Sequence, residues 1–333
     1  MAGDAGIGTR EDPTVDRRPP VLERLPAMAT TGVGSLPFPE PGAAVRHATR
    51  AYELPFCPQL PQLDGDMVSE WLGSGWAGGA SCGWSAERDR ERPVAWDATL
   101  DALAGPRGRP PRHRLVKLQV TGPVTLAVAL ERAAGRSGAG AEVLDLARDV
   151  GGWLAANVAG QVARLRQAEL DALVVVDEPG LAHAEVDDLA GVWDPLARCG
   201  TAWGLHVCSQ VPWATVGRAA PDLLSFDITR YPVGGEAAAA IAALVRRGGR
   251  VAWGALDPVR PDGPANVASR VVSAIGTVGA QGIAVDRLFA QSLVTPSCGT
   301  GRLSPRRERL VASVLAAGAE VALAAAAAWP AEG

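Results

Sequence analysis

The stretch ALVVVDEP, residues 172 to 179, is an apolar run that stops at two carboxylates and a proline. A second run, TAWGLHVC at 201 to 208, stops at a histidine and a cysteine two positions apart, and the segment between the runs, 185 to 199, carries apolar residues at helical spacing. Continuous apolar strands joined by amphipathic helices are typical of parallel sheets that are buried on both faces. These runs therefore predict a strand-helix-strand unit with polar side chains at the carboxyl ends of both strands.

The same alternation continues along the chain in both directions. We expect eight strands, at 30 to 37, 54 to 60, 115 to 122, 172 to 179, 201 to 208, 223 to 228, 250 to 256 and 287 to 298. Helical periodicity fills the segments 142 to 170, 185 to 199, 213 to 220, 236 to 247 and 265 to 281. Eight strands alternating with helices in 333 residues most simply close into a single α/β (β/α)8 TIM barrel, with an open doubly wound sheet as the alternative.

Three segments fall outside this alternation. Residues 1 to 28 are acidic and rich in Gly and Pro, which predicts a flexible leader before a barrel domain of 29 to 330. Residues 73 to 113, between strands two and three, are too long and too rich in Gly, Arg and Trp for a plain connection. We expect a lid-like insertion there, with a merely variable insertion as the alternative. The alanine run near the C-terminus follows the charged SPRRERL, so it predicts a final amphipathic helix rather than a membrane span.

Composition narrows the class of partner. A formal net charge of −4 without a long basic stripe argues against nucleic acid and against a membrane surface, and favours a small soluble ligand. The five cysteines are odd in number and widely spread, unlike the framework of a small secreted domain. They predict reduced thiols and a cytoplasmic protein.

Polar side chains gather at the expected carboxyl ends of the strands, where the catalytic groups of (β/α)8 barrels lie. They are Ser35, Thr121, Asp177, Glu178, His206, Cys208, Asp227, Asp257 and Cys298. Because residues two apart in a strand point to the same side, His206 and Cys208 present an imidazole and a thiol together. Asp227 and Cys298 would complete a set of zinc-ligand types around the mouth of the barrel, the end at which the strands stop. The alternative is a core cysteine and a surface histidine without a metal.

Seven short motifs, in order along the chain and at or near strand ends, carry a resemblance to a known family. They are TTGVGSLP (30 to 37), GDMV (65 to 68), VTGPVT (120 to 125), VVVDEPGL (174 to 181), LHVC (205 to 208), LSFD (224 to 227) and PSCG (296 to 299). From about residue 30 to 325 the chain resembles the C-terminal catalytic half of cobalamin-independent methionine synthase, within the superfamily that includes uroporphyrinogen decarboxylase.

The resemblance implies a zinc-dependent methyltransferase that alkylates a thiol, with homocysteine as the family's acceptor. It implies a Zn²⁺ cofactor held by His206, Cys208, Cys298 and Asp227, which would bind the acceptor as a thiolate. Asp177 would hold the acceptor's ammonium group, and Ser35 with neighbouring backbone amides would hold its carboxylate. As site residues we therefore expect Asp177 and Asp257 for catalysis, and for substrate binding Gly34, Ser35, Asp66, Asp177 and Glu178. A helix cap is the alternative role for Asp177, and a simple turn for Ser35.

The chain departs from the family pattern at the ligands of the acceptor and the metal. Asp227 stands where the family has a glutamate, which is one methylene longer. Pro61 and Leu63 stand near the position of the family's second carboxylate for the amino group, with Asp64 or Asp66 as possible substitutes.

Further departures concern the methyl donor and proton transfer. Val259 follows Asp257 where the family has a catalytic histidine, and an alanine in VTLAVAL replaces the tryptophan that stacks on folate. The N-terminal barrel of the full-length enzyme is also absent from this sequence. These departures leave the donor open between a folate and a methylcorrinoid protein.

Three other functions are compatible with the sequence. A corrinoid-dependent methyltransferase with another thiol acceptor would use the same His-x-Cys and distant Cys. A lyase similar to uroporphyrinogen decarboxylase would use arginines such as Arg88, Arg90 and Arg92 for the carboxylates of a tetrapyrrole, and no zinc. A non-catalytic zinc-binding barrel would hold the metal with four protein ligands.

Overall fold

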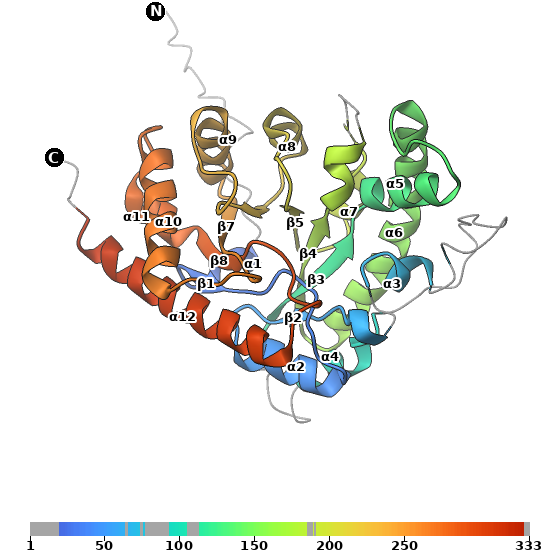
Figure 1. The fold of residues 1–333 in the computed structure, drawn as a ribbon, viewed down its shortest axis with the longest axis horizontal. Helices are drawn as coiled ribbons and strands as arrows, with labels where there is room; N and C mark the ends of the chain where they lie inside the picture. Colours follow the sequence, from blue (N-terminus) through green and yellow to red (C-terminus); the bar gives the residue numbers. More distant parts are fainter. Residues whose placement is uncertain are drawn as a thin grey trace, which may run out of the picture.

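The parallel strands predicted from the sequence form one curved sheet (Figure 1). The computed structural model describes residues 20–63, 66–73, 76, 93–104, 113–184, 189 and 191–329. Within them the strands run in the order β1-β8-β7-β6-β5-β4-β3-β2, and each ladder is parallel. Their bounds are β1 Ala29–Thr30, β2 Phe56–Cys57, β3 Leu115–Thr121, β4 Asp171–Asp177, β5 Ala202–Val207, β6 Leu223–Asp227, β7 Arg250–Leu256 and β8 Ser292–Pro296.

The two ends of this strand order, β1 and β2, meet and close the ring. The amide of Leu54 donates to the carbonyl of Thr30 (3.0 Å), and further along Gln59 donates to Gly34 (3.1 Å) while Leu36 donates to Gln59 (2.9 Å). The expected (β/α)8 barrel is therefore confirmed, and the doubly wound sheet is not the fold.

The first two strands are much shorter than the runs 30 to 37 and 54 to 60 predicted. In the first run, the carbonyls of Gly32 and Val33 turn inward and accept hydrogen bonds from the side chain of Lys117. Those carbonyls are therefore lost to a strand ladder, because each is already occupied within the barrel.

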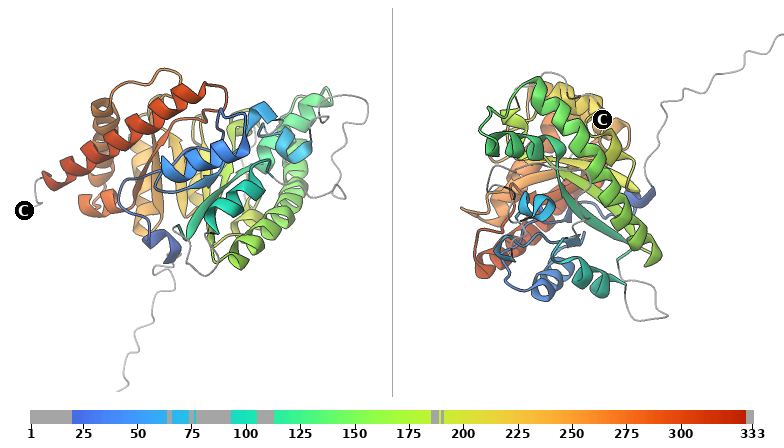
Figure 2. Two further views of the ribbon diagram at one scale, coloured as in Figure 1. Left: turned by 90° about the horizontal axis from the view of Figure 1, so that it is seen from below. Right: turned by 90° about the vertical axis from the view of Figure 1, so that its right-hand side faces the viewer.

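The helices lie outside the strands, as the periodicity predicted (Figures 1 and 2). Residues that alternate along β4 pack on two sides: Leu173 and Val175 join the cluster inside the barrel, while Val174 and Val176 pack with the helices. The helices and 3-10 turns are α1 Pro20–Glu23, α2 Pro41–Arg50, η1 Pro61–Leu63, α3 Ser69–Leu72, α4 Trp96–Leu103, α5 Pro123–Ala133, α6 Ala141–Gln167, η2 Pro179–His183, α7 Asp194–Ala197, α8 Trp213–Ala219, α9 Gly235–Arg246, α10 Pro264–Gly279, α11 Val285–Ala290 and α12 Pro305–Ala327.

One expected strand begins too early. The apolar residues Leu288 and Phe289, placed in the last strand by their hydrophobicity, belong to α11 and are buried as one helical face. Strand β8 starts only at Ser292. Short apolar runs do not distinguish a buried helix turn from a strand, and this one was assigned to the wrong element.

Part of the segment predicted as a leader belongs to the barrel. Val21, Leu22 and Leu25 are buried and join Leu173 and Val175 in the cluster inside the strands. The guanidinium of Arg250 holds this segment by donating to the carbonyl of Leu25 (2.9 Å). Residues 20 to 28 therefore close the end of the barrel where the strands begin, and residues 1 to 19 lie outside the described part.

Only part of the predicted lid lies within the described residues. That part includes helix α4, which belongs to the outer layer of the barrel. In α4, Trp96 and Thr99 are fully buried, and the Thr99 hydroxyl contacts the sulfur of Cys57 in β2 (3.5 Å). This helix packs against α2 on the outside of the barrel. Residues 77 to 92 and 105 to 112 of the predicted lid, with Cys82 and the three arginines named above, lie outside the described residues.

The last helix is anchored in the barrel wall. By length and composition alone, α12 could cross a membrane. Near its start, however, Glu308 is fully buried and accepts hydrogen bonds from Tyr52 Oη (2.7 Å) and His47 Nε2 (2.9 Å), both from the α2 region. The helix also packs against α10 and β8, as the predicted final helix of the barrel would.

Candidate active site

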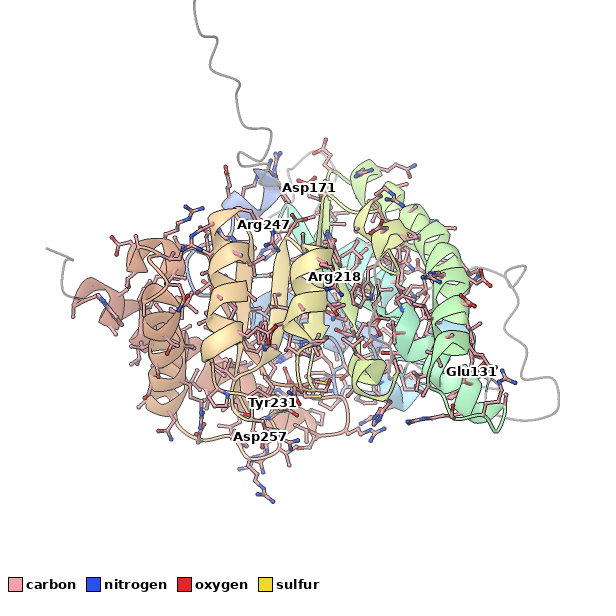
Figure 3. The ribbon with its side chains drawn as sticks, turned by 90° about the horizontal axis from the view of Figure 1, so that it is seen from above. Glu131, Asp171, Arg218, Tyr231, Arg247 and Asp257 are labelled. Atoms are coloured by element: carbon pink, nitrogen blue, oxygen red, sulfur yellow. The ribbon has the colours of Figure 1, made fainter. Side chains whose placement is uncertain are left out.

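The carboxyl ends of the strands bring polar groups into one row. Strand register aligns Thr121 with Asp177, Asp177 with His206, and His206 with Ser225, across the neighbouring strands β3 to β6. In Figure 3, Tyr231 and Asp257, which follow β6 and β7, lie at the end of the molecule opposite to Asp171 and Arg247. A set of polar groups at this end of a barrel is the usual place for an active site.

Two cysteines from opposite parts of the sheet meet in the mouth. Cys208 follows β5 and Cys298 follows β8, and β6 and β7 lie between those strands in the sheet order. Both cysteines are free, and the Cys208 thiol donates a hydrogen bond to the Cys298 sulfur. That hydrogen bond lowers the pKa of Cys298 to about 7, and the same bond together with burial raises the pKa of Cys208. The two thiols therefore lie within hydrogen-bonding reach of each other, and their contact favours ionisation of Cys298 over that of Cys208.

His206 is held as a neutral imidazole. It is 3 % exposed, and its Nδ1 lies 2.9 Å from Ser225 Oγ. Burial, aided by the charge of Lys117, lowers the pKa of His206 to about 3. Its Nε2 is buried and has no hydrogen-bond partner among the residues that the structure describes. A neutral imidazole with one nitrogen oriented by a hydroxyl and the other unpartnered has the form of a metal-binding histidine.

Asp227, the fourth expected ligand, is bound to its own turn. It is 4 % exposed, and its Oδ1 accepts hydrogen bonds from the Thr229 amide (2.7 Å), the Thr229 hydroxyl (2.6 Å) and the Arg230 amide (3.2 Å). Among the described residues, no three His, Cys, Asp or Glu side chains stand close enough to hold a metal ion together. The donors are thus suited to zinc in type, but they are not arranged as a finished coordination sphere.

Asp177 faces the barrel interior at the end of β4. It is 3 % exposed and accepts a hydrogen bond from Gln119 Nε2. Burial raises its pKa, while the positive charge of Lys117 and the Gln119 hydrogen bond oppose that rise. Its carboxylate caps no helix among the described contacts, so the alternative role considered for it finds no support.

Glu178 lies in the barrel wall. Its carboxylate accepts hydrogen bonds from the amides of Val124 (3.1 Å) and Thr125 (2.8 Å), the Thr125 hydroxyl (2.6 Å) and Trp193 Nε1 (2.8 Å). It therefore caps the amino end of α5, and its expected role in substrate binding stays a prediction. The Gly122 in the TGP motif lies so close that a Cβ there would come within 2.0 Å of the Glu178 carboxyl carbon.

Ser35 lies against the loop that carries Cys298. Its carbonyl accepts from the Thr300 amide (3.0 Å), and its hydroxyl accepts from the Gly301 amide (3.2 Å). Gly34 lies directly over Gln119, because a Cβ at Gly34 would come within 2.6 Å of the Gln119 Cγ. Both residues thus line the mouth beside the cysteine pair and Asp177.

Asp66 and Asp257 stabilise local turns. Asp66 accepts from the amides of Val68 (3.0 Å) and Ser69 (3.2 Å) and from the Ser69 hydroxyl (2.6 Å), so it caps α3. Asp257 accepts from the amide of Val259 (2.9 Å) at the rim. The substrate-binding role expected for Asp66 and the catalytic role expected for Asp257 stay predictions, since the described contacts of both residues are local.

Three buried polar residues of the site escaped the sequence analysis. Lys117 and Gln119 lie inside the barrel on β3. Glu70 of α3 is 6 % exposed, and one of its carboxylate oxygens has no partner within the described part of the chain. Burial raises the pKa of Glu70 to about 8. A signal for the first two was present: Lys, Gln and Thr stand at alternate positions of the run LVKLQVT, where an entirely apolar strand was expected.

The fold and site define a (β/α)8 barrel with a cysteine pair, a buried neutral imidazole and a buried carboxylate at the carboxyl ends of its strands. No family model matches the chain, and no curated protein matches it.

Two solved structures share the fold. A B12-independent methionine synthase from Shewanella sp. W3-18-1 in complex with selenomethionine is similar at a TM-score of 0.58 and 15% identity, covering 91% of this chain and 100% of that one. A methyltransferase from Methanosarcina mazei is similar at a TM-score of 0.54 and 14% identity, covering 90% of this chain and 96% of that one. At these identities the likeness establishes the architecture over nearly the whole chain.

Proposed function

We propose that this protein is a zinc-dependent methyltransferase that moves a methyl group to a thiol, with homocysteine as the acceptor and methionine as the product. The observation that carries the proposal is the dithiol of Cys208 and Cys298, assembled across the barrel beside His206 and Asp177. The shared fold with a methionine synthase that holds selenomethionine supports an amino-acid ligand.

The donor set suits zinc. Cys208, Cys298 and the unpartnered Nε2 of His206 would hold the ion, and Asp227 would approach it through the carboxylate oxygen that its own turn leaves free. When bound, zinc lowers the pKa of a coordinated thiol and so supplies a thiolate nucleophile at neutral pH. Ser225 would keep the His206 ring oriented, since it bonds the other ring nitrogen.

The remaining groups of the mouth match the two charged ends of an amino acid. Asp177 is a buried carboxylate that can bind an ammonium group, and the backbone around Gly34 and Ser35 can bind a carboxylate. Ser35 is oriented by the Gly301 amide, and this fixes the loop against the turn that carries Cys298. Such positioning would hold the acceptor sulfur beside the cysteines for attack on the methyl donor.

The methyl donor is proposed to be a folate or a methylcorrinoid protein. We propose the cytoplasm as the compartment, because the four described cysteines are free and two of them serve the site as thiols.

The test is zinc-edge X-ray absorption on protein purified without chelator, before and after addition of L-homocysteine. We expect one zinc per chain and one additional sulfur ligand when homocysteine is added. Cys208→Ala and Cys298→Ala should lose the metal, whereas Cys199→Ala, at the outer end of α7, should keep it.

The other outcomes separate the alternatives. Zinc that does not respond to the thiol would favour a non-catalytic metal-binding barrel. A well-folded chain without metal would contradict the proposal and favour a lyase on the same barrel. If homocysteine binds, turnover with methyltetrahydrofolate or with a methylated corrinoid protein identifies the donor.

A further inference from the structure

The basic residues of this chain are arginines with a single exception. Of the 32 lysines and arginines, only residue 117 is a lysine. That side chain is 3 % exposed and lies inside the barrel on β3, and none of the ion pairs among the described residues includes it. Burial lowers the pKa of Lys117 to about 7, while the charge of Asp177 opposes that change, so the amino group depends on its hydrogen-bond partners.

The three N–H donors of Lys117 are all used. The ammonium nitrogen lies 2.7 Å from the carbonyl oxygen of Gly32, 2.5 Å from that of Val33 and 2.5 Å from Gln119 Oε1. No donor remains for a substrate. Lys117 therefore acts on the site above it only through these three groups.

Two paths of hydrogen bonds connect Lys117 to the groups that face the mouth. In the first, Gln119 accepts from Lys117 and donates its Nε2 to Asp177, so the amide dipole links the buried amino group to the buried carboxylate. In the second, the carbonyls of Gly32 and Val33 are fixed immediately before Gly34 and Ser35. One buried amino group thus orients both the carboxylate proposed for an ammonium group and the loop proposed for a carboxylate.

A lysine suits this position better than an arginine. The space beside it is lined by Gln119, His206 and Ser225 among others, so the amino group is enclosed by side chains of the neighbouring strands. The Phe56 ring lies 5.0 Å from the ammonium nitrogen, and Gly32 is pressed against that ring. The compact amino group of a lysine fits at this position, whereas the larger planar guanidinium group of an arginine does not.

We propose that Lys117 is a positioning residue which, through Gln119 and the Gly32–Ser35 loop, makes the site selective for thiols that carry both an amino and a carboxylate group. The inference rests on the proposed thiol methylation and extends it, because it names the groups that set acceptor selectivity. Lys117 touches neither the acceptor nor the cysteines; it orients the groups that do.

The experiment compares L-homocysteine with 4-mercaptobutanoate, which lacks only the amino group. Dissociation constants are measured calorimetrically on the zinc-loaded full chain for the wild type, Lys117→Met and Gln119→Met. We expect both variants to reduce the preference for homocysteine about tenfold or more, because each removes a hydrogen bond that orients a charged group. Zinc content should stay at the wild-type level.

The two variants also differ from each other in a way that a general structural defect would not produce. Gln119→Met cuts only the path to Asp177, so binding of 4-mercaptobutanoate should stay within about twofold of the wild type. Lys117→Met releases the loop as well and should weaken both thiols. Gln291→Met is the matched control, since Gln291 is a buried glutamine bonded to the carbonyls of Val245 and Gly249 at the other end of the barrel. Equal weakening of both acceptors by Gln119→Met, or no change, would overturn the proposal.

The single lysine supplies a second readout that needs no acceptor. With ¹³C- and ¹⁵N-labelled lysine, the side chain of Lys117 gives one set of resonances. Asp177→Asn should shift them, whereas Asp262→Asn, which removes a charge from the partly exposed pair with Arg270, should not. An unchanged signal in Asp177→Asn would overturn the link between Lys117 and Asp177. If the wild type binds neither thiol, the proposed function and the selectivity both fail, and the resonances alone decide whether the link exists.

Discussion

At the scale of single residues, the site depends on groups kept in unusual ionisation states by burial and by one another. Burial, neighbouring charges and hydrogen bonds shift the pKa values of four side chains from those of free side chains. They are Cys298, His206, Asp177 and Glu70. Such shifts gather in active sites, because the same burial that excludes water also prepares groups for binding and catalysis. They can be tested one residue at a time.

The cysteine pair should show its hydrogen bond in its reactivity. In zinc-free protein, alkylation of Cys298 by iodoacetamide should rise through a midpoint near pH 7, because the thiolate is stabilised by the Cys208 thiol. Cys208→Ala removes that donor and should move the midpoint upward. Peptide mass spectrometry follows the reaction at Cys298 specifically, and zinc loading should protect it. An unmoved midpoint in the variant would contradict the hydrogen bond.

Glu70 should make stability depend on pH. Burial raises the pKa of Glu70 from 4.5 to about 8. The contribution of its neutral carboxyl group to the free energy of unfolding is therefore fully present below pH 4.5, and it is lost as pH rises toward 8. Glu70→Gln mimics the protonated form, so the variant should gain stability over the wild type across that interval, on the order of 3 kcal/mol at pH 8 relative to pH 4.5.

Urea unfolding at a series of pH values measures this gain. Glu142→Gln, an exposed position in the first turn of α6, is the control and should show no comparable gain in stability as pH rises. A constant difference for Glu70→Gln as well would contradict the raised pKa.

At the scale of elements, the DEP turn after β4 joins three parts of the wall. Glu178 bonds the first amides of α5 and the indole of Trp193, while the backbone of the same turn reaches α5 through Gly180, whose amide donates to Thr125 Oγ1 (3.0 Å). The two carboxylates of this turn therefore have different roles. Asp177 faces the mouth, and Glu178 fastens the strand end to the next helix.

This division predicts opposite effects of two substitutions. Glu178→Ala leaves the amides of Val124 and Thr125 and the Trp193 indole unpaired in the interior, which should cost about 3 kcal/mol of unfolding free energy. Asp177→Asn keeps a hydrogen-bonding side chain and should change stability little while abolishing acceptor binding. Thermal unfolding and calorimetric titration separate the two. If Glu178→Ala weakens homocysteine binding without destabilising the fold, the assignment of Glu178 to the wall is wrong.

At the scale of the whole molecule, the barrel is closed at one end and open at the other. Residues 20 to 28 fill the end where the strands begin, and the cysteine pair and Asp177 lie at the end where they stop. We call residues 20 to 28 the plug; within it, Leu22 is 2 % exposed. The plug lies far along the strands from the mouth, so its packing should support stability without direct contact with the site.

Truncation of the plug tests this arrangement. Leu22→Ala should lower the unfolding free energy by about 2 to 4 kcal/mol, as expected for a buried leucine whose site cannot fully collapse. Zinc content and homocysteine affinity should remain at wild-type values. Chemical denaturation gives the first quantity and calorimetry the second, and a loss of affinity at unchanged stability would contradict the separation of plug and mouth.

The sequence by itself determined the barrel and most of its strands. Apolar runs ending in polar residues located β3 to β7 closely, because parallel strands buried on both faces leave a continuous hydrophobic pattern. It also placed His206, Cys208, Cys298 and Asp177 at the carboxyl ends of strands, because those ends are visible in the chain as the points where apolar runs stop.

Only the tertiary structure decided which of these residues share a space and which way they point. Cys208 and Cys298 meet because the sheet curves, and no local pattern contains that curvature. Glu178 and Asp66 read as site residues, yet they cap helices, because a carboxylate satisfies whichever donors its backbone brings nearest. Lys117 stands in an apolar strand, and its role exists only once the barrel has brought Gly32, Val33 and Asp177 around it. Such roles depend on contacts between segments distant in the chain, which folding creates and a linear pattern does not encode.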